Sequence, residues 1–188
     1  MKRSLLAAAL VLVAAASPAA AGTPTLSGLA VTRQGDDYLL SCRLVGGLSP
    51  AMLEEIEAGI ETTLEYRLQV YHRRSGLPDN QVTRRVVQCS VRHDALTRQY
   101  TLTRRVDGDL VETRVSSDPA EMRDFLTNLR NVPVARAAEF VTGEEYYVRA
   151  RCDLGLVWRF YLIPWRLDTD WARITVAPPQ EEALDSGR

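Results

Sequence analysis

Apolar and polar side chains alternate along much of this chain, which is typical of half-buried β-strands. The first such run places Tyr38, Leu40 and Leu44 on one side. Turn-forming residues at 75–80 and 107–108 separate later runs, so the neighbouring strands are expected to be antiparallel. Strands are predicted over residues 37–45, 64–70, 82–91, 99–105, 110–115, 146–152 and 171–176.

Helical spacing of apolar residues occurs twice, each time after a capping residue and a proline. Ser49 precedes Pro50 and Asp118 precedes Pro119, an arrangement that suits the first turn of a helix. The first helix is expected to end at Gly59 and the second at 131–133. The predicted apolar faces are Met52, Leu53, Ile56 and Ile60, and Met122, Phe125, Leu126 and Leu129. The predicted fold class is α+β and strand-dominated: an antiparallel β-sandwich or curved sheet with two short helices inserted in connections.

The N-terminal 21 residues have the pattern of a secretory signal peptide. Lys2 and Arg3 precede an apolar run at 5–16, and three alanines at 19–21 supply a small-residue cleavage site. The run is shorter than the roughly 20 residues that cross a bilayer. We therefore expect cleavage near Ala21-Gly22 and export to the periplasm. The expected segments are a signal peptide at 1–21, one β-rich domain at 22–177 and a disordered acidic tail at 178–188.

The charge and the cysteine content limit the kinds of ligand and covalent link that we expect for this chain. The chain carries 23 basic and 24 acidic residues, a balance that argues against general nucleic-acid binding. Cys42, Cys89 and Cys152 each share a strand side with apolar neighbours, and we interpret them as buried thiols. In an oxidising compartment the alternative is one disulfide and one leftover cysteine, in a pairing that the sequence does not specify. No metal is predicted, because C-x-x-C is absent and His72 and His93 are the only histidines.

No set of residues predicts catalysis. The chain has no G-x-S-x-G, P-loop or H-E-x-x-H motif. His93 and Asp94 are the best candidate pair, but neighbours in a strand point to opposite faces. Asp168 and Asp170 could bind a cation through carboxylate oxygens, yet their spacing is that of an ordinary turn. We predict no catalytic residues and no cofactor.

Five longer stretches resemble a known family. They are LSPAMLEEIEAGIETTLEY at 48–66, DALTRQY at 94–100, RNVPVARAAEF at 130–140, YYVRARCDL at 146–154 and IPWRLDTDW at 163–171. In this order they resemble domain-of-unknown-function family 4390, exported proteins of Gram-negative bacteria. The resemblance implies an exported β-rich domain with no established activity and no catalytic residues. The neighbourhoods of the family's genes imply an association with membrane sensor kinases.

Arginine is concentrated on the predicted central hairpin. Nine arginines and two aspartates lie between positions 66 and 105, in a chain whose net charge is −1. Guanidinium groups suit phosphate and carboxylate ligands, so this stretch is a candidate anion-binding surface. The alternative is a solvated strand face that keeps sheet edges from aggregating. The candidate anion contacts are Arg73, Arg74, Arg84, Arg85, Arg104 and Arg105.

Aromatic residues are concentrated at 154–165. This segment, LGLVWRFYLIPW, is too short and too charged to span a membrane. It is either a core strand covered on both faces or an exposed loop that contacts a protein or a membrane interface. Pro164 favours the loop. The candidate contact residues are Trp158, Phe160, Tyr161, Trp165 and Arg166.

These observations predict an exported, non-catalytic binding or accessory module of the cell envelope. The expected partner is an envelope or inner-membrane protein, with an anionic lipid surface as another candidate and nucleic acid excluded. One alternative is a small periplasmic enzyme or ligand carrier with a pocket between sheet and helices. Another is a structural envelope component that acts through oligomerisation.

Overall fold

Ten strands and two short helices make up most of the described chain. The computed structural model describes residues 23–159 and 163–176, apart from the side chains of 156–166. The predicted signal peptide and acidic tail therefore lie outside the described residues. The elements are β1 (Thr25–Gln34), β2 (Asp37–Val45), α1 (Pro50–Glu57), β3 (Thr62–His72), β4 (Asn80–Asp94), β5 (Gln99–Val106), β6 (Asp109–Ser116), α2 (Pro119–Thr127), β7 (Asn128–Arg136), the 3-10 turn Ala137–Glu139, β8 (Tyr146–Arg159), β9 (Ile163–Asp168) and β10 (Ala172–Val176).

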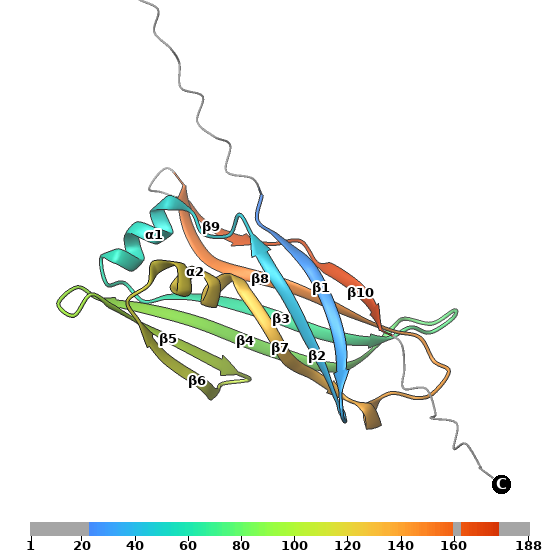
Figure 1. Ribbon diagram of the computed structural model, residues 1–188. Helices are drawn as coiled ribbons and strands as arrows, with labels where there is room; N and C mark the ends of the chain where they lie inside the picture. Colours follow the sequence, from blue (N-terminus) through green and yellow to red (C-terminus); the bar gives the residue numbers. More distant parts are fainter. Residues whose placement is uncertain (1–22, 160–162, 177–188) are drawn as a thin grey trace, which may run out of the picture.

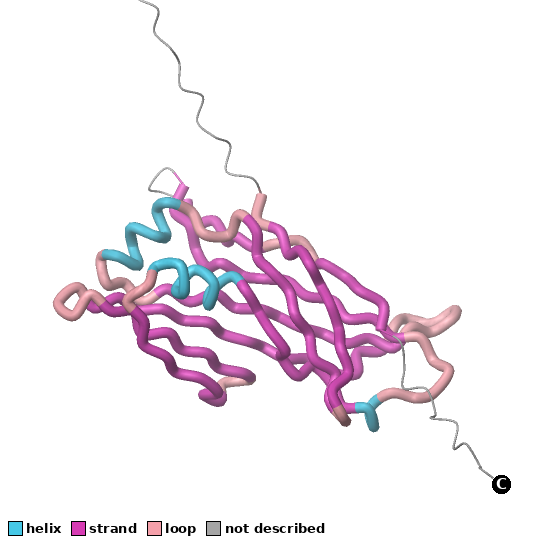
Figure 2. The backbone as a smooth tube through the Cα atoms, viewed as in Figure 1, coloured by secondary structure: helices cyan, strands magenta, loops and turns pink. Residues whose placement is uncertain are grey.

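The strands form two antiparallel sheets. The small sheet has the order β1-β2-β7, and the large sheet has the order β10-β8-β3-β4-β5-β6, with β9 paired to β8. Figure 1 shows the small sheet crossing in front of the large one, with α1 and α2 at one end. The β5–β6 hairpin extends beyond the small sheet, and strands dominate the whole backbone trace in Figure 2. The predicted strand-dominated α+β fold is confirmed.

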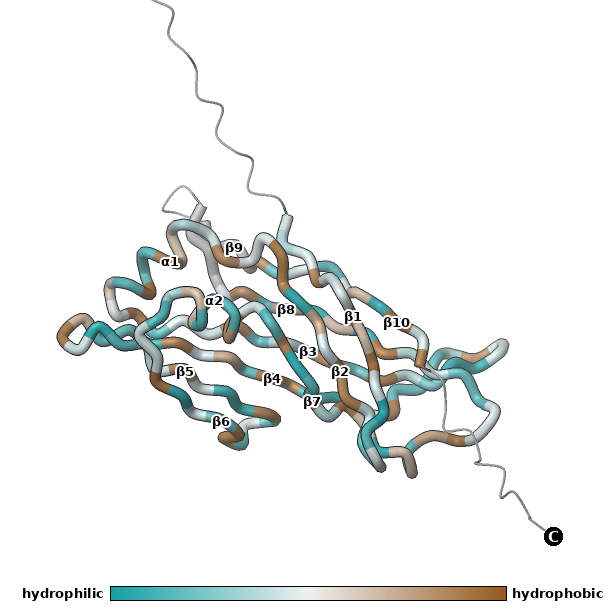
Figure 3. The backbone as a smooth tube through the Cα atoms, viewed as in Figure 1, coloured by the Kyte–Doolittle hydropathy of each residue, from teal (hydrophilic) through white to brown (hydrophobic). Residues whose placement is uncertain are grey.

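The core lies between the two sheets. Apolar positions alternate with polar ones along the long strands, as the brown and teal bands of Figure 3 show. Leu40 of the small sheet and Leu64, Val87 and Leu102 of the large sheet are all fully buried. Burying each of these side chains contributes about 1.5–3 kcal/mol relative to leaving it exposed. The two-residue period therefore decides which face of each sheet packs inward.

Both predicted helix starts are confirmed. The Ser49 hydroxyl accepts a hydrogen bond from the Met52 amide, and Pro50 occupies the first turn of α1. The Asp118 carboxylate accepts from the Ala120 amide in the same way at α2. These bonds satisfy amide groups that have no partner inside the helix.

Three strands were not predicted from the sequence. Strand β1 is largely exposed and its pairing shifts between Ser27 and Ala30, so its apolar residues do not alternate. Strand β7 follows α2 without a break, which corrects the prediction that 131–133 only end a helix. Pro133 is tolerated in β7 because the register shifts beside its partner Leu39.

Strand β9 also corrects a prediction, because Pro164 had favoured a loop. Pro164 lies opposite Trp158 in the antiparallel β8–β9 pair. Among the described strands β9 pairs with β8 alone, so it is an edge strand, where proline is tolerated.

The three cysteines are free and buried, as the first interpretation held. Burial is the main cause that raises the pKa of each thiol, and the pKa of Cys42 reaches about 12. We expect no reaction with a thiol reagent at neutral pH until denaturant is added, because the thiolate is the reactive form. All three thiols should then react. A single reactive thiol in the non-reduced, unfolded chain would instead reveal a disulfide.

Candidate functional site

The six candidate arginines do not form one surface. Consecutive strand residues point to opposite faces, so Arg84 and Arg105 lie on the outer face of the large sheet, whereas Arg85 and Arg104 lie on its inner face. Arg73 and Arg74 follow the end of β3. The concentration of arginine along the sequence is therefore divided between two faces and one end of the sheet.

The inner-face arginines are held by carboxylates. Arg85 pairs with Asp107 at 2.9 Å, and Arg104 pairs with Glu112 at 3.1 Å. The Arg104 guanidinium also lies 4.6 Å from the centre of the Phe125 ring, and its side chain is only 15% exposed. The Arg104 contacts attach the β5–β6 hairpin to α2, and the Arg85 pair joins β4 to the turn between β5 and β6, so both residues are structural.

An array of aromatic and arginine side chains lies on the outer face of the large sheet, where β3, β8 and β10 are neighbours. We call Tyr71, Tyr147, Arg149, Trp171 and Arg173 the outer-face array. Tyr71 lies opposite Tyr147 across β3 and β8, and Arg149 lies opposite Arg173 across β8 and β10. The two tyrosine rings stack with their centres 5.3 Å apart. Register therefore places residues from three strands side by side, and Trp171 joins them from the turn before β10.

Arginines lie against each ring of this array. The Arg149 guanidinium is 4.5 Å from the Tyr71 ring centre and 4.4 Å from that of Trp171. The Arg173 guanidinium is 3.6 Å from the Tyr147 ring centre. Each contact is a cation–π interaction, worth about 0.5–1 kcal/mol at exposed sites and more when desolvated. The planar groups consequently present a stiff, positively charged surface.

Arg149 keeps its charge without a carboxylate partner. Its Nε donates to Gln69 Oε1 at 2.8 Å and its Nη2 donates to Tyr71 Oη at 2.8 Å, and both acceptors are neutral. Within the described residues, neither Arg149 nor Arg173 forms an ion pair. The neighbouring Arg67 and Arg151 differ, because Glu65, Asp153 and Asp168 pair with them. The array is therefore a part of this face where two arginines lie side by side without a direct carboxylate partner among the described residues, with the Asp79 carboxylate as the nearby acid that the charge of Arg173 influences.

Tyr147 connects the array to the loop after β3. Its hydroxyl donates to Asp79 Oδ2 at 2.7 Å. This hydrogen bond is the main cause that lowers the pKa of Asp79, and the charge of Arg173 adds to it. Burial and the contact with Asp79 raise the pKa of Tyr147, so the tyrosine stays protonated and remains the donor.

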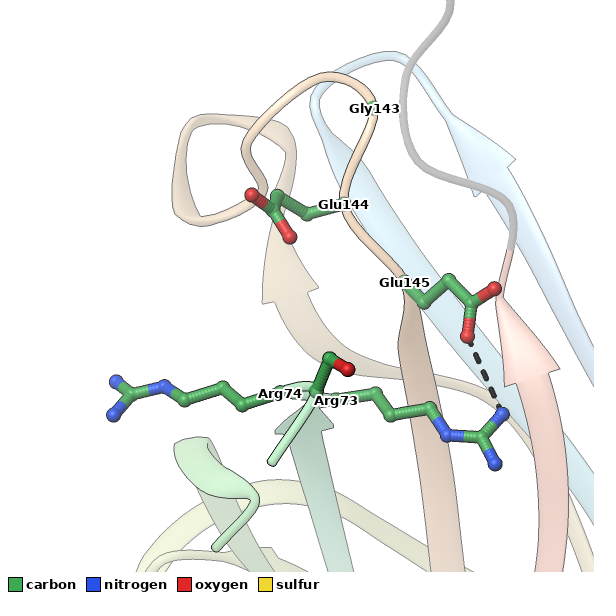
Figure 4. Close-up of a pocket in the computed structure, with 6 residues that line it drawn as sticks. Arg73, Arg74, Gly143, Glu144 and Glu145 are labelled. Atoms are coloured by element: carbon green, nitrogen blue, oxygen red, sulfur yellow. Dashed lines mark hydrogen bonds and ion pairs between the residues drawn. The ribbon is translucent and has the colours of Figure 1, made fainter. Parts of the chain in front are cut away.

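A polar hollow of about 580 Å³ lies beyond the end of the array, lined by Arg73, Arg74, Ser75, Gly143, Glu144 and Glu145. Figure 4 shows Arg73 and Glu145 turned toward each other, while Arg74 extends to the opposite side. The Arg73–Glu145 ion pair measures 3.3 Å, and His72 lies 3.0 Å from Glu144. Exposed pairs of this kind contribute about 0–1 kcal/mol. Because its arginine and glutamate charges offset each other, this hollow attracts an anion less than the array does.

The described part of the aromatic segment lies in the paired ends of β8 and β9. The backbone places Val157 opposite Trp165 and Trp158 opposite Pro164. Phe160 and Tyr161 lie outside the described residues, as do the side chains of Trp158, Trp165 and Arg166. The predicted contact role of these five residues stays a prediction.

His93 and Asp94 act separately, as their positions in the strand predicted. The Asp94 carboxylate accepts from the amides of Leu96 and Thr97 and shapes the following turn. His93 Nδ1 lies 3.1 Å from the Glu57 carbonyl oxygen, and its ring lies against Tyr100. The Tyr100 hydroxyl donates to Glu57 Oε1 at 2.5 Å. His93 therefore belongs to the attachment of α1 to the large sheet.

This attachment should make stability fall at high pH. Burial, and then the hydrogen bond to Glu57, raises the pKa of Tyr100 to about 12. Tyrosine in an unfolded chain ionises near pH 10. The stabilisation is complete below about pH 10 and is lost as the pH rises toward 12, because only the unfolded chain then loses the proton. Urea unfolding at about pH 8 and about pH 11 should show a smaller fall in stability for Y100F than for the wild type. Equal falls would contradict this assignment.

Two neighbouring residues of the last turn, Asp168 and Thr169, make structural contacts. Asp168 pairs with Arg151 at 2.5 Å, and the hydroxyl of the buried Thr169 accepts from the Cys152 amide. Over the described ranges, no group of three or more His, Cys, Asp or Glu side chains could hold a metal ion. No helix in the described part of the chain has the length and apolar character needed to cross a membrane.

Sequence reasoning missed every member of the outer-face array. The one available signal was the alternation of Tyr147, Arg149 and Arg151 in β8, which marks a polar outer face. No sequence pattern near Trp171 and Arg173 indicated that these two residues would lie beside Tyr147 and Arg149.

Comparison with protein families gives a match over most of the chain. The model of the family described as Domain of unknown function (DUF4390) matches residues 21–175. This confirms the resemblance drawn from the five stretches. No curated protein and no solved structure matches.

Proposed function

Because this chain belongs to the DUF4390 family, whose function is unknown, we propose its function from the outer face of its large sheet. We propose that the protein is an exported, non-catalytic binding module of the cell envelope. The outer-face array receives acidic groups of an envelope protein, and the β8–β9 hairpin adds an aromatic contact.

One observation carries this proposal: Arg149 and Arg173 are positioned by rings and neutral acceptors rather than by carboxylates. An arginine fixed in this way loses little side-chain freedom when it binds a carboxylate, because its conformation is already restricted. Tyrosine, tryptophan and arginine are also the residues that dominate the energetics of protein interfaces.

The aromatic hairpin includes strand β8, which also carries two residues of the array. Strand β8 carries Arg149 and continues to Trp158, while Trp171 follows β9 by three residues. A partner that covers the array could therefore also reach the hairpin. Sensor kinases, through the family association, are one class of membrane protein to look for in the capture experiment.

Crosslinking of the tagged protein in intact cells tests the proposal. The wild type should capture an envelope protein, whereas W158A/W165A should capture much less and retain its fold by circular dichroism. Capture of nothing by the wild type would remove the binding role. Unfolding of the double variant would place the two tryptophans in the core and remove the hairpin from the proposed contact.

A ligand carrier is a second candidate, because one hollow is mainly apolar. It measures about 380 Å³ and lies between β5–β6 and β7, with Val106, Val111, Val132 and Pro133 among its lining residues. Arg104 and Arg130 stand at the same hollow. Native mass spectrometry of gently purified protein would favour this candidate if a small molecule remained bound.

A further inference from the structure

Strand β6 is the open edge of the large sheet. In the described chain it pairs with β5 on one side, while β10 at the opposite edge lies against β1. Exposed apolar side chains are concentrated on β6: Leu110, Val111 and Val115 are each 56% exposed. An open edge of this kind is a template for pairing with another chain, which proteins usually block or use.

We propose that β6 pairs with β6 of a second copy, antiparallel, about a two-fold axis at Thr113. The pairing rests on the order of residues in the strand, Asp109-Leu-Val-Glu-Thr-Arg-Val-Ser116. With Thr113 opposite itself, Glu112 of each copy faces Arg114 of the second copy. Val115 of each copy then lies next to the segment around Val111 of the second copy, where the pairing of β6 with β5 shifts register. The strand is therefore complementary to itself, as a two-fold interface requires.

Charge selects this register over its neighbours. A two-fold axis at Glu112 would set two glutamates directly opposite each other, and an axis at Arg114 would do the same with two arginines. Opposite charges in cross-strand pairs are favourable and like charges are unfavourable. Residues 112–116 are regularly paired with β5, and the register shift falls at Val111, between the pairs Arg104–Glu112 and Arg105–Leu110.

The two charged residues already lie together on the inner face of the sheet. Glu112 contacts Arg114 within one chain, and it also pairs with Arg104 at 3.1 Å. Arg114 pairs with Glu121 of α2 at 3.0 Å. In the dimer these pairs would join into one alternating network across both copies. A second copy fits the edge better than an unrelated peptide does, because the two charged residues of each copy meet their complements. The outer-face array stays exposed, since it lies at the opposite side of the sheet.

Thr113 offers a sharp test, because it is exposed and lies on the proposed axis. A lysine there would meet a second lysine, and a glutamate would meet a second glutamate. We expect T113K and T113E each to be monomeric by light scattering where the wild type is dimeric, and a mixture of the two to form a heterodimer. The control T101K changes an exposed threonine on the adjacent strand, away from the axis, and should stay dimeric.

Three results would overturn the proposal: a wild type that is monomeric at the highest attainable concentration, a T113K variant that is as dimeric as the wild type, or a mixture that forms no heterodimer. Circular dichroism of each variant confirms the fold. The test does not depend on the proposed envelope partner, because it uses the purified protein alone.

Discussion

Replacing Tyr66 with alanine is expected to lower the free energy of unfolding by about 3–5 kcal/mol, the range for removing a large buried aromatic ring. Tyr66 lies in the middle of β3 and is fully buried. Its hydroxyl donates to the Leu126 carbonyl oxygen at 2.6 Å, where α2 approaches β7. The ring therefore joins the large sheet to the helix that leads into the small sheet. A loss of this size is a large part of the roughly 5–15 kcal/mol that stabilises a typical domain.

Y66F separates packing from hydrogen bonding. The ring stays, but the buried Leu126 carbonyl loses its donor, which should cost about 1–3 kcal/mol. Urea unfolding of wild type, Y66F and Y66A measures both terms. A Y66F variant as stable as the wild type would show that the hydroxyl does not join the two layers.

Replacing Arg149 and Arg173 with glutamine is expected to reduce capture of the envelope partner at least tenfold. Removing one member of a charge pair at an interface typically costs about 2–5 kcal/mol, and each 1.4 kcal/mol is about a factor of ten in affinity. Stability should change little, because neither guanidinium is buried or in an ion pair among the described residues. Quantitative blotting of crosslinked product at equal protein level gives the measurement.

The matched control is R33Q/R123Q, which removes two exposed arginines from β1 and α2. It makes the same change in net charge, so it should capture the partner as well as the wild type does. Equal loss in both double variants would mean that net charge, and not the array, attracts the partner.

Local pattern was sufficient to predict most of the architecture. The strict alternation in β3 and the Ser49-Pro50 and Asp118-Pro119 caps depend on neighbours within a few residues. Strands β1, β7 and β9 were not predicted because they contain features that usually argue against a strand, which their pairing nevertheless accommodates. Examples are the exposed, shifted register of β1 and the prolines of β7 and β9.

The candidate site depended on information that a local reading does not contain. Counting arginines from 66 to 105 treated Arg84 and Arg85, or Arg104 and Arg105, as one surface, whereas the strand pleat separates them. The outer-face array instead joins residues from β3, β8, β10 and the turn before β10. Such neighbours are set by register across strands far apart in sequence, which the composition of any one segment does not reveal.

The most direct test of the proposed binding face is site-specific photo-crosslinking in intact cells. A photoreactive residue at Thr175 lies in the array, because Thr175 is exposed and opposite Tyr147. The same residue at Thr32 lies on the exposed small sheet as a control. We expect an envelope protein to be crosslinked from position 175 and not from position 32. Crosslinking from position 32 alone, or from neither position, would contradict it.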